Sequence, residues 1–184
     1  MRAAASPGVG IHATAVIYGE SGVVMLGESG SGKSALALAL LARAKATGRF
    51  GALIGDDRVW VSASGGRLLA SGAPHMAGLI ERRADGVQSA PSEPVAVIRL
   101  VVDLSGPNRR WPRWPSHPDE SIAGVGVPRL ALDSAASAVD NAVSVDARLA
   151  LIAVQKGGEI GISLEQSAAV HKNRNLRLRG RVQE

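Results

Sequence analysis

Residues 27–34 read Gly-Glu-Ser-Gly-Ser-Gly-Lys-Ser, a complete match to the glycine-rich pattern G-x-x-x-x-G-K-[ST]. The apolar run 23–26 precedes this segment, and the alanine- and leucine-rich run 35–42 follows it. Because a strand, a glycine loop and a helix in this order form the context in which the pattern binds phosphate, we predict a phosphate-binding loop. A chance match in a glycine-rich chain is the alternative, and the flanking segments argue against it.

The loop pattern assigns a task to each of its conserved positions. Glycines allow the tight turn that points successive backbone N–H groups at phosphate oxygens, and the N-terminus of the following helix adds further donors. Lys33 is expected to reach the β- and γ-phosphates, and the Ser34 hydroxyl to ligate Mg²⁺. The predicted nucleotide-binding residues are Gly27, Glu28, Ser29, Gly30, Ser31, Gly32, Lys33 and Ser34.

The bulk composition suits one domain with an aliphatic core. The chain has 184 residues, 46% of them hydrophobic but only 3% aromatic. It contains no cysteine, which excludes disulfides and thiolate metal sites and fits a reducing compartment. Residues 1–7 lack the apolar region of a signal peptide, and no apolar run has the length of a membrane span. We therefore expect a cytoplasmic protein without membrane association.

Two positively charged segments contribute to the net charge of +5. The tail over residues 171–184 is read as a solvated terminus, with an acidic protein partner as the alternative. The segment 109–114 places Trp111 and Trp114 among arginines and prolines. Such a segment can stack on nucleic acid, but a surface loop or an oligomer contact is the preferred interpretation.

Hydrophobic patterning predicts an α/β domain with a mixed sheet and few helices. Helices are expected over 34–47 and over 145–155, the second capped by Asn141 or Ser144. The β-rich stretch that follows the first helix departs from a regular βαβα alternation. Strands are expected over residues 11–18, 23–26, 52–55, 58–62, 67–71, 78–82, 95–103 and 129–132.

Two adjacent acids, Asp56 and Asp57, follow the apolar strand 52–55. They come 23 residues after Lys33, a spacing of one helix and one strand, so we expect them beside the loop. Neighbouring residues of a strand point to opposite faces, so both acids can serve one site only where the strand breaks. One carboxylate can then hold Mg²⁺ and the other can accept a proton from an attacking hydroxyl. An acid pair in a structural turn is the alternative.

Glu81 lies in the charged segment 78–87 and can complete a magnesium site, since Mg²⁺ takes carboxylate and phosphate oxygens. Taken alone, this segment reads as a solvated charge cluster. His12 lies in an expected strand, where a lone histidine usually packs or faces solvent.

Together, Ile11-His12-Ala13, the loop 27–34, Leu53–Asp57 and Gly78–Val87 resemble the catalytic domain of the HPr kinase/phosphorylase family. The order and spacing are similar to the short form found in some proteobacteria, and the resemblance covers about residues 8–155 of what would be a single domain. It implies a domain similar to phosphoenolpyruvate carboxykinase that uses ATP and Mg²⁺ to phosphorylate a serine of HPr or of a nitrogen-branch relative. It also implies a homo-oligomer and, in bifunctional members, removal of the phosphate by phosphorolysis.

The resemblance also implies residue roles. Asp56 would be the general base of the kinase step, with His12 as a supporting partner and Lys33 on the phosphates. The implied metal site comprises Ser34, Asp57 and Glu81.

Departures from the family pattern leave two other functions open. A proline- and arginine-rich loop of longer members is replaced by residues 132–138, which contain no arginine, and Arg82 and Asp85 replace apolar residues. The alternatives are an ATP sensor without turnover and a small-molecule kinase that shares the loop and the acid pair.

Overall fold

A mixed β-sheet and two α-helices make up the fold, which a computed structural model describes for residues 8–82, 85–104 and 119–158. The helices are α1 (Lys33–Ala46) and α2 (Ala138–Gly158), with a short 3₁₀ helix at Pro74–Met76. The strands are β1 (Val9–His12), β2 (Thr14–Tyr18), β3 (Ser21–Leu26), β4 (Gly51–Gly55), β5 (Arg58–Ser64), β6 (Arg67–Gly72), β7 (Leu79–Arg82), β8 (Gly86–Ser89), β9 (Val95–Asp103), β10 (Glu120–Ile122), β11 (Val125–Val127) and β12 (Arg129–Ala131). The chain divides into two units, residues 1–149 and residues 150–184, and the described part of the second is the last part of α2.

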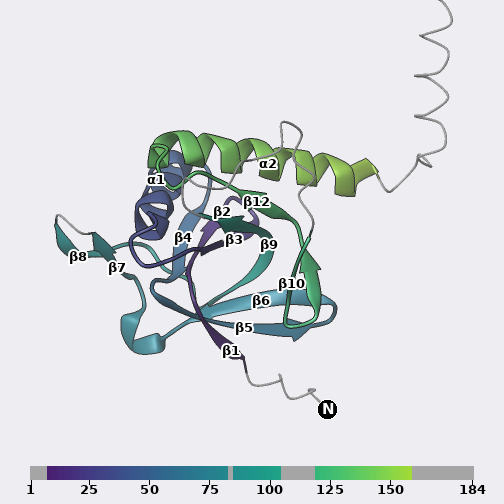
Figure 1. Cartoon of the computed structure of the whole chain (residues 1–184), viewed down its shortest axis with the longest axis horizontal. Coiled ribbons are helices and arrows are strands. Elements are labelled where there is room, and N and C mark those ends of the chain that lie inside the picture. The colour runs from purple at the N-terminus through teal and green to yellow at the C-terminus, as the bar shows by residue number, and fades with distance from the viewer. Residues whose placement is uncertain (1–7, 83–84, 105–118, 159–184) are drawn as a thin grey trace, which may run out of the picture. The chain divides into compact units, whose positions relative to one another are not determined.

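The main sheet has the strand order β1-β5-β6-β9-β3-β2-β4, and β12 pairs with β9 outside this path (Figure 1). The long strand β9 connects its two parts, because β9 pairs antiparallel with β6 at one end and parallel with β3 at the other. Two hairpins, β7–β8 and β10–β11, form separate two-stranded sheets. The expectation of a mixed sheet with few helices is confirmed for the described residues.

Strand β2 lies between β3 and β4 and runs antiparallel to both. Strands β3 and β4 therefore run in the same direction, and their carboxyl ends lie at one edge of the sheet. The first residue of β2, Thr14, lies at this same edge. The loop that follows β3 and the acid pair that follows β4 are thereby brought close together, on either side of the start of β2.

The sheet buries apolar residues on both faces. One face encloses an aliphatic core from seven strands and from the residue between β1 and β2: Ala13, Ala15, Val24, Ile54, Val59, Val61, Leu68, Ala70, Ala96, Ile98, Val101 and Val127. On the opposite face, α1 packs against β2 and β4 and buries Leu36, Ala37 and Leu40. Helix α1 thus packs against β4, the strand that leads to the acid pair, and against its neighbour β2.

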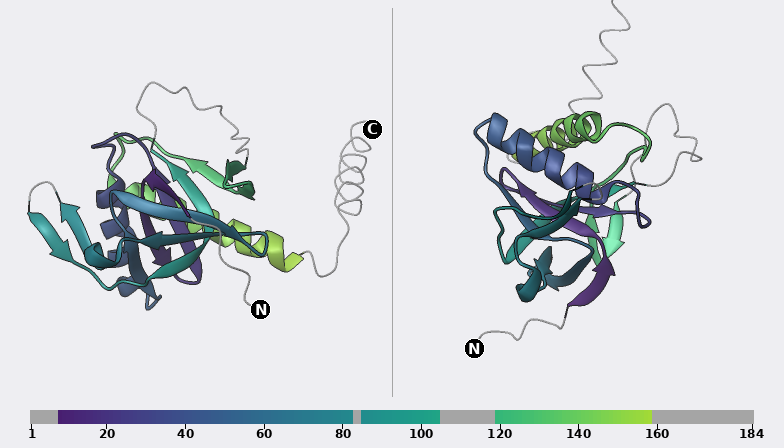
Figure 2. Two further views of the ribbon diagram at one scale, coloured as in Figure 1. Left: turned by 90° about the horizontal axis from the view of Figure 1, so that it is seen from below. Right: turned by 90° about the vertical axis from the view of Figure 1, so that its left-hand side faces the viewer.

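Helix α2 lies on the same side of the sheet as α1 over its residues 138–149, as Figure 2 shows. Asp146 of α2 accepts hydrogen bonds from Arg43 of α1 at 2.7 and 3.0 Å and forms an ion pair with Arg49. Burial alone would raise the pKa of the Asp146 carboxyl, but the two guanidinium groups outweigh it and hold that pKa below its ordinary value. Neither helix, over the residues that the structure describes, is long and apolar enough to cross a membrane.

Most of the predicted elements are confirmed, and α2 needs a correction. It begins at Ala138, about two turns before the predicted residue 145. Its cap is Ser137, whose hydroxyl accepts from the Asp140 N–H at 3.1 Å and donates to the Asp140 carboxylate at 2.7 Å. The predicted caps Asn141 and Ser144 lie inside the helix.

Three short strands, β8, β10 and β11, were not predicted from the sequence. The predicted strand 11–18 is two strands, β1 and β2, which Ala13 separates, and β1 begins at Val9. The Trp111/Trp114 segment and the basic tail 171–184 lie outside the described residues, so their interpretation stays a prediction.

A close contact between two backbones holds the end of β4, and hence the acid pair, against β6. A Cβ added to Gly72 would lie 1.9 Å from the Ile54 carbonyl oxygen and 3.3 Å from the Gly55 Cα. No real Cβ comes so near a backbone oxygen, and a backbone oxygen cannot turn aside as a side chain can. Glycine at position 72 therefore allows β4 and β6 to approach each other beside Asp56.

We expect Gly72→Ala to lower the free energy of unfolding by about 3 kcal/mol, since the added methyl group would force β4 and β6 apart. Gly126→Ala in β11 is the matched control, because its added Cβ would meet nothing nearer than 3.7 Å. Chemical denaturation of both variants measures the difference. Equal stability of the two variants would show that the contact is not needed.

The ion pairs of Asp146 predict how stability responds to acid. Because the pKa of this carboxyl is lower in the folded chain, its contribution to stability is present above the ordinary aspartate pKa and is lost as the pH falls below it. Denaturation midpoints of the wild type should therefore fall more steeply below about pH 4 than those of Asp146→Asn. Glu20→Gln, a change in the exposed turn between β2 and β3, should behave like the wild type. Parallel acid profiles for Asp146→Asn and the wild type would contradict this.

Candidate functional site

The glycine-rich loop connects the carboxyl end of β3 to the N-terminus of α1, as its pattern predicts. Gly27 has φ 147°, and a Cβ at this position would lie 2.5 Å from the Ser31 hydroxyl and 2.9 Å from the Leu104 carbonyl oxygen. The loop therefore turns in a space that only glycine fits. Helix α1 starts at Lys33, and Lys33, Ser34 and Ala35 of its first turn line a pocket of about 380 Å³. Amides of a first helical turn have no acceptor within the helix and can donate to an anion.

Lys33 is 7% exposed, and its ammonium group has three partners. Its Nζ donates to the carbonyl oxygens of Gly27 and Glu28, both at 2.9 Å, and lies 3.1 Å from Nε2 of His12. Burial lowers the pKa of Lys33, and the nearby carboxylates of Asp57 and Asp56 partly offset this. The loop thus holds a partly desolvated cation over backbone oxygens, and a phosphate group could replace these with fully charged oxygens.

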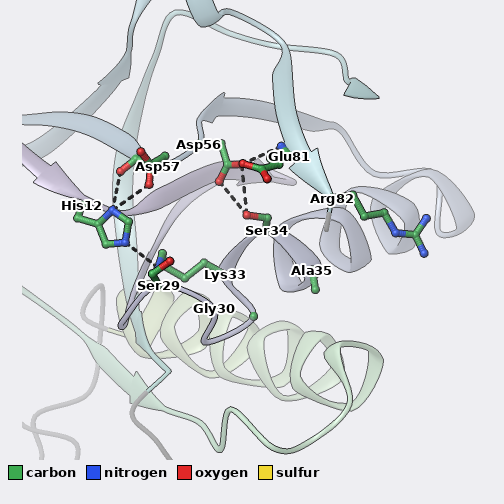
Figure 3. Close-up of a pocket in the computed structure, with 11 residues that line it drawn as sticks. His12, Ser29, Gly30, Lys33, Ser34, Ala35, Asp56, Asp57, Glu81 and Arg82 are labelled. Carbon is green, nitrogen blue, oxygen red and sulfur yellow. Dashed lines mark hydrogen bonds and ion pairs between the residues drawn. The ribbon is translucent and has the colours of Figure 1, made fainter. Parts of the chain in front are cut away.

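His12, at the end of β1, connects Lys33 to Asp57. Its Nδ1 lies 3.0 Å from the Asp57 carboxylate and 3.1 Å from the Asp57 carbonyl oxygen, while its Nε2 faces Lys33 (Figure 3). With its proton on Nδ1, the ring donates to Asp57 through Nδ1 and accepts from the Lys33 ammonium group through Nε2. Asp57 adopts φ 64°, and its side chain is 84% exposed. The strand break expected at the acid pair is confirmed, because β4 ends at Gly55.

The Asp56 carboxylate lies on the other side of the loop and accepts hydrogen bonds from three elements. The Thr14 hydroxyl of β2 donates to Oδ1 at 2.6 Å. The Ser34 hydroxyl of α1 lies 3.0 Å from Oδ1 and 3.2 Å from Oδ2. The Glu81 backbone N–H of β7 donates to Oδ2 at 3.1 Å. Asp56 therefore joins the helix that starts at the loop to the strands on either side of the pocket.

One pocket collects most of the predicted site residues. It is lined by His12, Ser29, Gly30, Gly32, Lys33, Ser34, Ala35, Asp56, Asp57, Glu81 and Arg82. Figure 3 shows the Glu81 side chain beside Asp56 and the Arg82 side chain directed away from the two aspartates. Gly27, Glu28 and Ser31 form the loop but do not line the pocket. Arg82 forms an exposed ion pair with Asp85 of the same hairpin, 2.9 Å apart, so its guanidinium group is not paired with Asp56 or Asp57 (Figure 3).

The oxygen donors at this pocket fit a magnesium ion held jointly with a phosphate group. The residues that the structure describes contain no cluster of three or more His, Cys, Asp or Glu side chains that could hold a metal by themselves. Mg²⁺ is usually bound through one or two carboxylates together with substrate phosphates and water, so such a cluster is not required. The Ser34 hydroxyl and Asp56 are already in contact, and Glu81 follows in the same pocket. Asp57 contacts His12 instead of Ser34.

Thr14 is a polar contact of the site that sequence reasoning missed. It is fully buried, and its hydroxyl makes the shortest hydrogen bond to Asp56. Its sequence signal is weak, because a threonine at the start of an apolar strand is ordinary. The antiparallel insertion of β2 between β3 and β4 brings Thr14 to Asp56.

Comparison with known proteins identifies the fold. No protein-family model and no curated protein sequence matches the chain. Among solved structures, the chain is similar to the Hpr(Ser) kinase/phosphatase from Coxiella burnetii, with a TM-score of 0.68 and 22% sequence identity. The match covers 82% of this chain and 99% of that one. The chain therefore has the fold of that kinase/phosphatase.

We expect Lys33→Ala to weaken the binding of ATP and of pyrophosphate by about 10- to 100-fold, because charge-assisted hydrogen bonds to phosphate are lost. Lys45→Ala, which removes an exposed lysine in the last turn of α1, should bind both anions like the wild type. Titration calorimetry with each anion measures the change. Unchanged affinity in Lys33→Ala would exclude the loop as the phosphate site.

Proposed function

We propose that this protein is an ATP-dependent kinase that phosphorylates a serine of a small phosphocarrier protein of the HPr type. The observation that carries the proposal is the meeting of Lys33 and Asp56 at one pocket, on a fold shared with an Hpr(Ser) kinase/phosphatase. A cation at a phosphate loop and a carboxylate beside it are two of the groups that recur in enzymes that transfer a phosphoryl group to a hydroxyl.

The phosphate loop would bind the triphosphate of ATP. Lys33 would exchange the carbonyl oxygens of Gly27 and Glu28 for phosphate oxygens, while His12, held by Asp57, keeps its Nε2 toward the ammonium group. Ser34 and Glu81, with Asp57 completing the set, would hold Mg²⁺ and leave Asp56 free to accept a proton. When bound, this ion neutralises charge on the phosphates.

In the transfer step, the serine oxygen of the acceptor would form a bond to the γ-phosphorus as the bond from that phosphorus to the bridging oxygen of ADP breaks. The proton of the serine hydroxyl would go to the Asp56 carboxylate, which then acts as general base. In the reverse direction, inorganic phosphate would attack the phosphoserine and Asp56 would return the proton, with pyrophosphate as the product. These roles of Asp56 and His12 follow the resemblance of the sequence to the HPr kinase/phosphorylase family.

A transfer assay with labelled ATP, Mg²⁺ and purified HPr-type carriers tests the proposal. Labelling should depend on the acceptor serine and disappear in carriers with that serine changed to alanine. Addition of inorganic phosphate then tests the reverse step. ATP binding without labelling of any carrier would instead support the ATP sensor, and labelling of a small molecule would support a small-molecule kinase.

We expect Asp56→Asn to reduce transfer by a factor of about 10² or more, because the amide cannot accept the hydroxyl proton, while ATP affinity stays near that of the wild type. Glu20→Gln, in the exposed turn before β3, is the control for loss of a carboxylate. Rates under saturating ATP and calorimetric ATP affinities provide the comparison. Equal transfer rates for Asp56→Asn and wild type would remove Asp56 from the mechanism.

A further inference from the structure

We propose that Thr14 is the positioning residue of the site, which fixes the orientation of the Asp56 carboxylate for the transfer step. The inference rests on the proposed function for its kinetic consequence, but its structural part holds for the ligand-free protein. It starts from the 2.6 Å hydrogen bond between the Thr14 hydroxyl and Asp56 Oδ1.

The three donors to Asp56 differ in how firmly each is held. Ser34 belongs to the phosphate loop, and its hydroxyl oxygen has a second task, since this position of the loop pattern ligates the magnesium ion. The Glu81 N–H belongs to β7, which pairs with β8 alone in a separate two-stranded sheet. Neither donor is therefore a fixed reference for the carboxylate.

Thr14 meets the requirements that the other two donors do not. It is 0% exposed and starts β2, a strand that pairs on both sides, with β3 and with β4. Its branched side chain has few rotamers, so the hydroxyl is held in one direction. An ionised carboxylate can only accept, and the hydroxyl therefore donates to it.

The pairing of β2 with β4 places Thr14 opposite the acid pair. The register of these two strands shifts between Ala15 and Val16, so that Ala15 faces Gly55 while Val16 faces Leu53. Irregularities of this kind re-aim side chains at the ends of strands and beside active sites. The Ala13 N–H also donates to the Asp57 carbonyl oxygen, at 3.3 Å, which holds the turn that carries both aspartates against the start of β2.

The role of Thr14 matters most when the Ser34 hydroxyl ligates the magnesium ion and no longer donates to Asp56. Thr14 would then keep Oδ1 occupied, so that Oδ2, which also accepts the Glu81 N–H, would turn its other lone pair to the acceptor hydroxyl. Loss of the Thr14 hydroxyl would let the carboxylate rotate without loss of any group that touches ATP. The effect should therefore fall on the transfer rate constant and leave nucleotide binding unchanged.

The test compares Thr14→Val, which has nearly the same shape without the hydroxyl, with Thr14→Ser, which keeps the hydroxyl. Thr47→Val is the matched control: Thr47 is the only other threonine of the chain, and its hydroxyl bonds the carbonyl oxygens of Arg43 and Ala44 at the end of α1. Two readouts are measured on the full chain, namely the NMR resonance of the Glu81 amide without ligand and the kinetics of transfer to the carrier.

We expect Thr14→Val to move the Glu81 amide resonance and to lower kcat about 10- to 100-fold at an unchanged KM for ATP. Thr14→Ser should restore both values, and Thr47→Val should change neither. A wild type that transfers no phosphate would defeat the proposed function alone, because the amide resonance still decides whether Thr14 positions Asp56. An unmoved Glu81 amide in Thr14→Val, or a loss in rate that Thr14→Ser does not restore, would overturn the inference.

Discussion

The hydrogen bonds of the Asp56 carboxylate hold the site together. Three elements that are distant in the sequence each direct one donor at this group: β2 through Thr14, α1 through Ser34 and β7 through Glu81. Hydrogen bonds to an ionised acceptor are stronger than those between neutral groups, and a partly buried network is costly to leave incomplete. The relative positions of the loop, the strand and the hairpin therefore depend on one carboxylate that also faces the pocket.

A second network on the opposite side of the loop is arranged differently. Asp57, His12 and Lys33 form a line in which each group contacts the next. The last group of this line is the Lys33 ammonium group, whose pKa is lowered, whereas the other network is centred on the Asp56 carboxylate. The two adjacent aspartates thus have separate environments because β4 ends at Gly55 and the chain turns through a positive φ at Asp57. A pocket with a cation on one side and hydroxyl and carboxylate oxygens on the other suits a polyphosphate held together with a metal ion.

The sequence predicted correctly those features that depend on residues close together in the chain. The loop 27–34 and the acid pair after residue 55 were found because glycine spacing and an acidic strand end impose local constraints. The start of α2 was wrong by about two turns, because the capping interaction of Ser137 with Asp140 precedes the part of the helix with the clearest apolar pattern. The position of β2 between β3 and β4 depends on pairing over long sequence distances, which periodicity does not report, and Thr14 was missed for this reason.

The hairpin β7–β8 illustrates what this arrangement means beyond the pocket. An isolated pair of strands is marginally stable in water, and this one has the buried Ile80 and the Glu81 N–H to hold it to the rest of the domain. The order of the hairpin and the state of the Asp56 carboxylate are therefore linked thermodynamically, and such linkage is reciprocal. A protein that binds the outer face of the hairpin would therefore change the hydrogen bonding of Asp56 in the pocket. A ligand bound in the pocket would in turn change the conformation of the hairpin that a partner protein contacts.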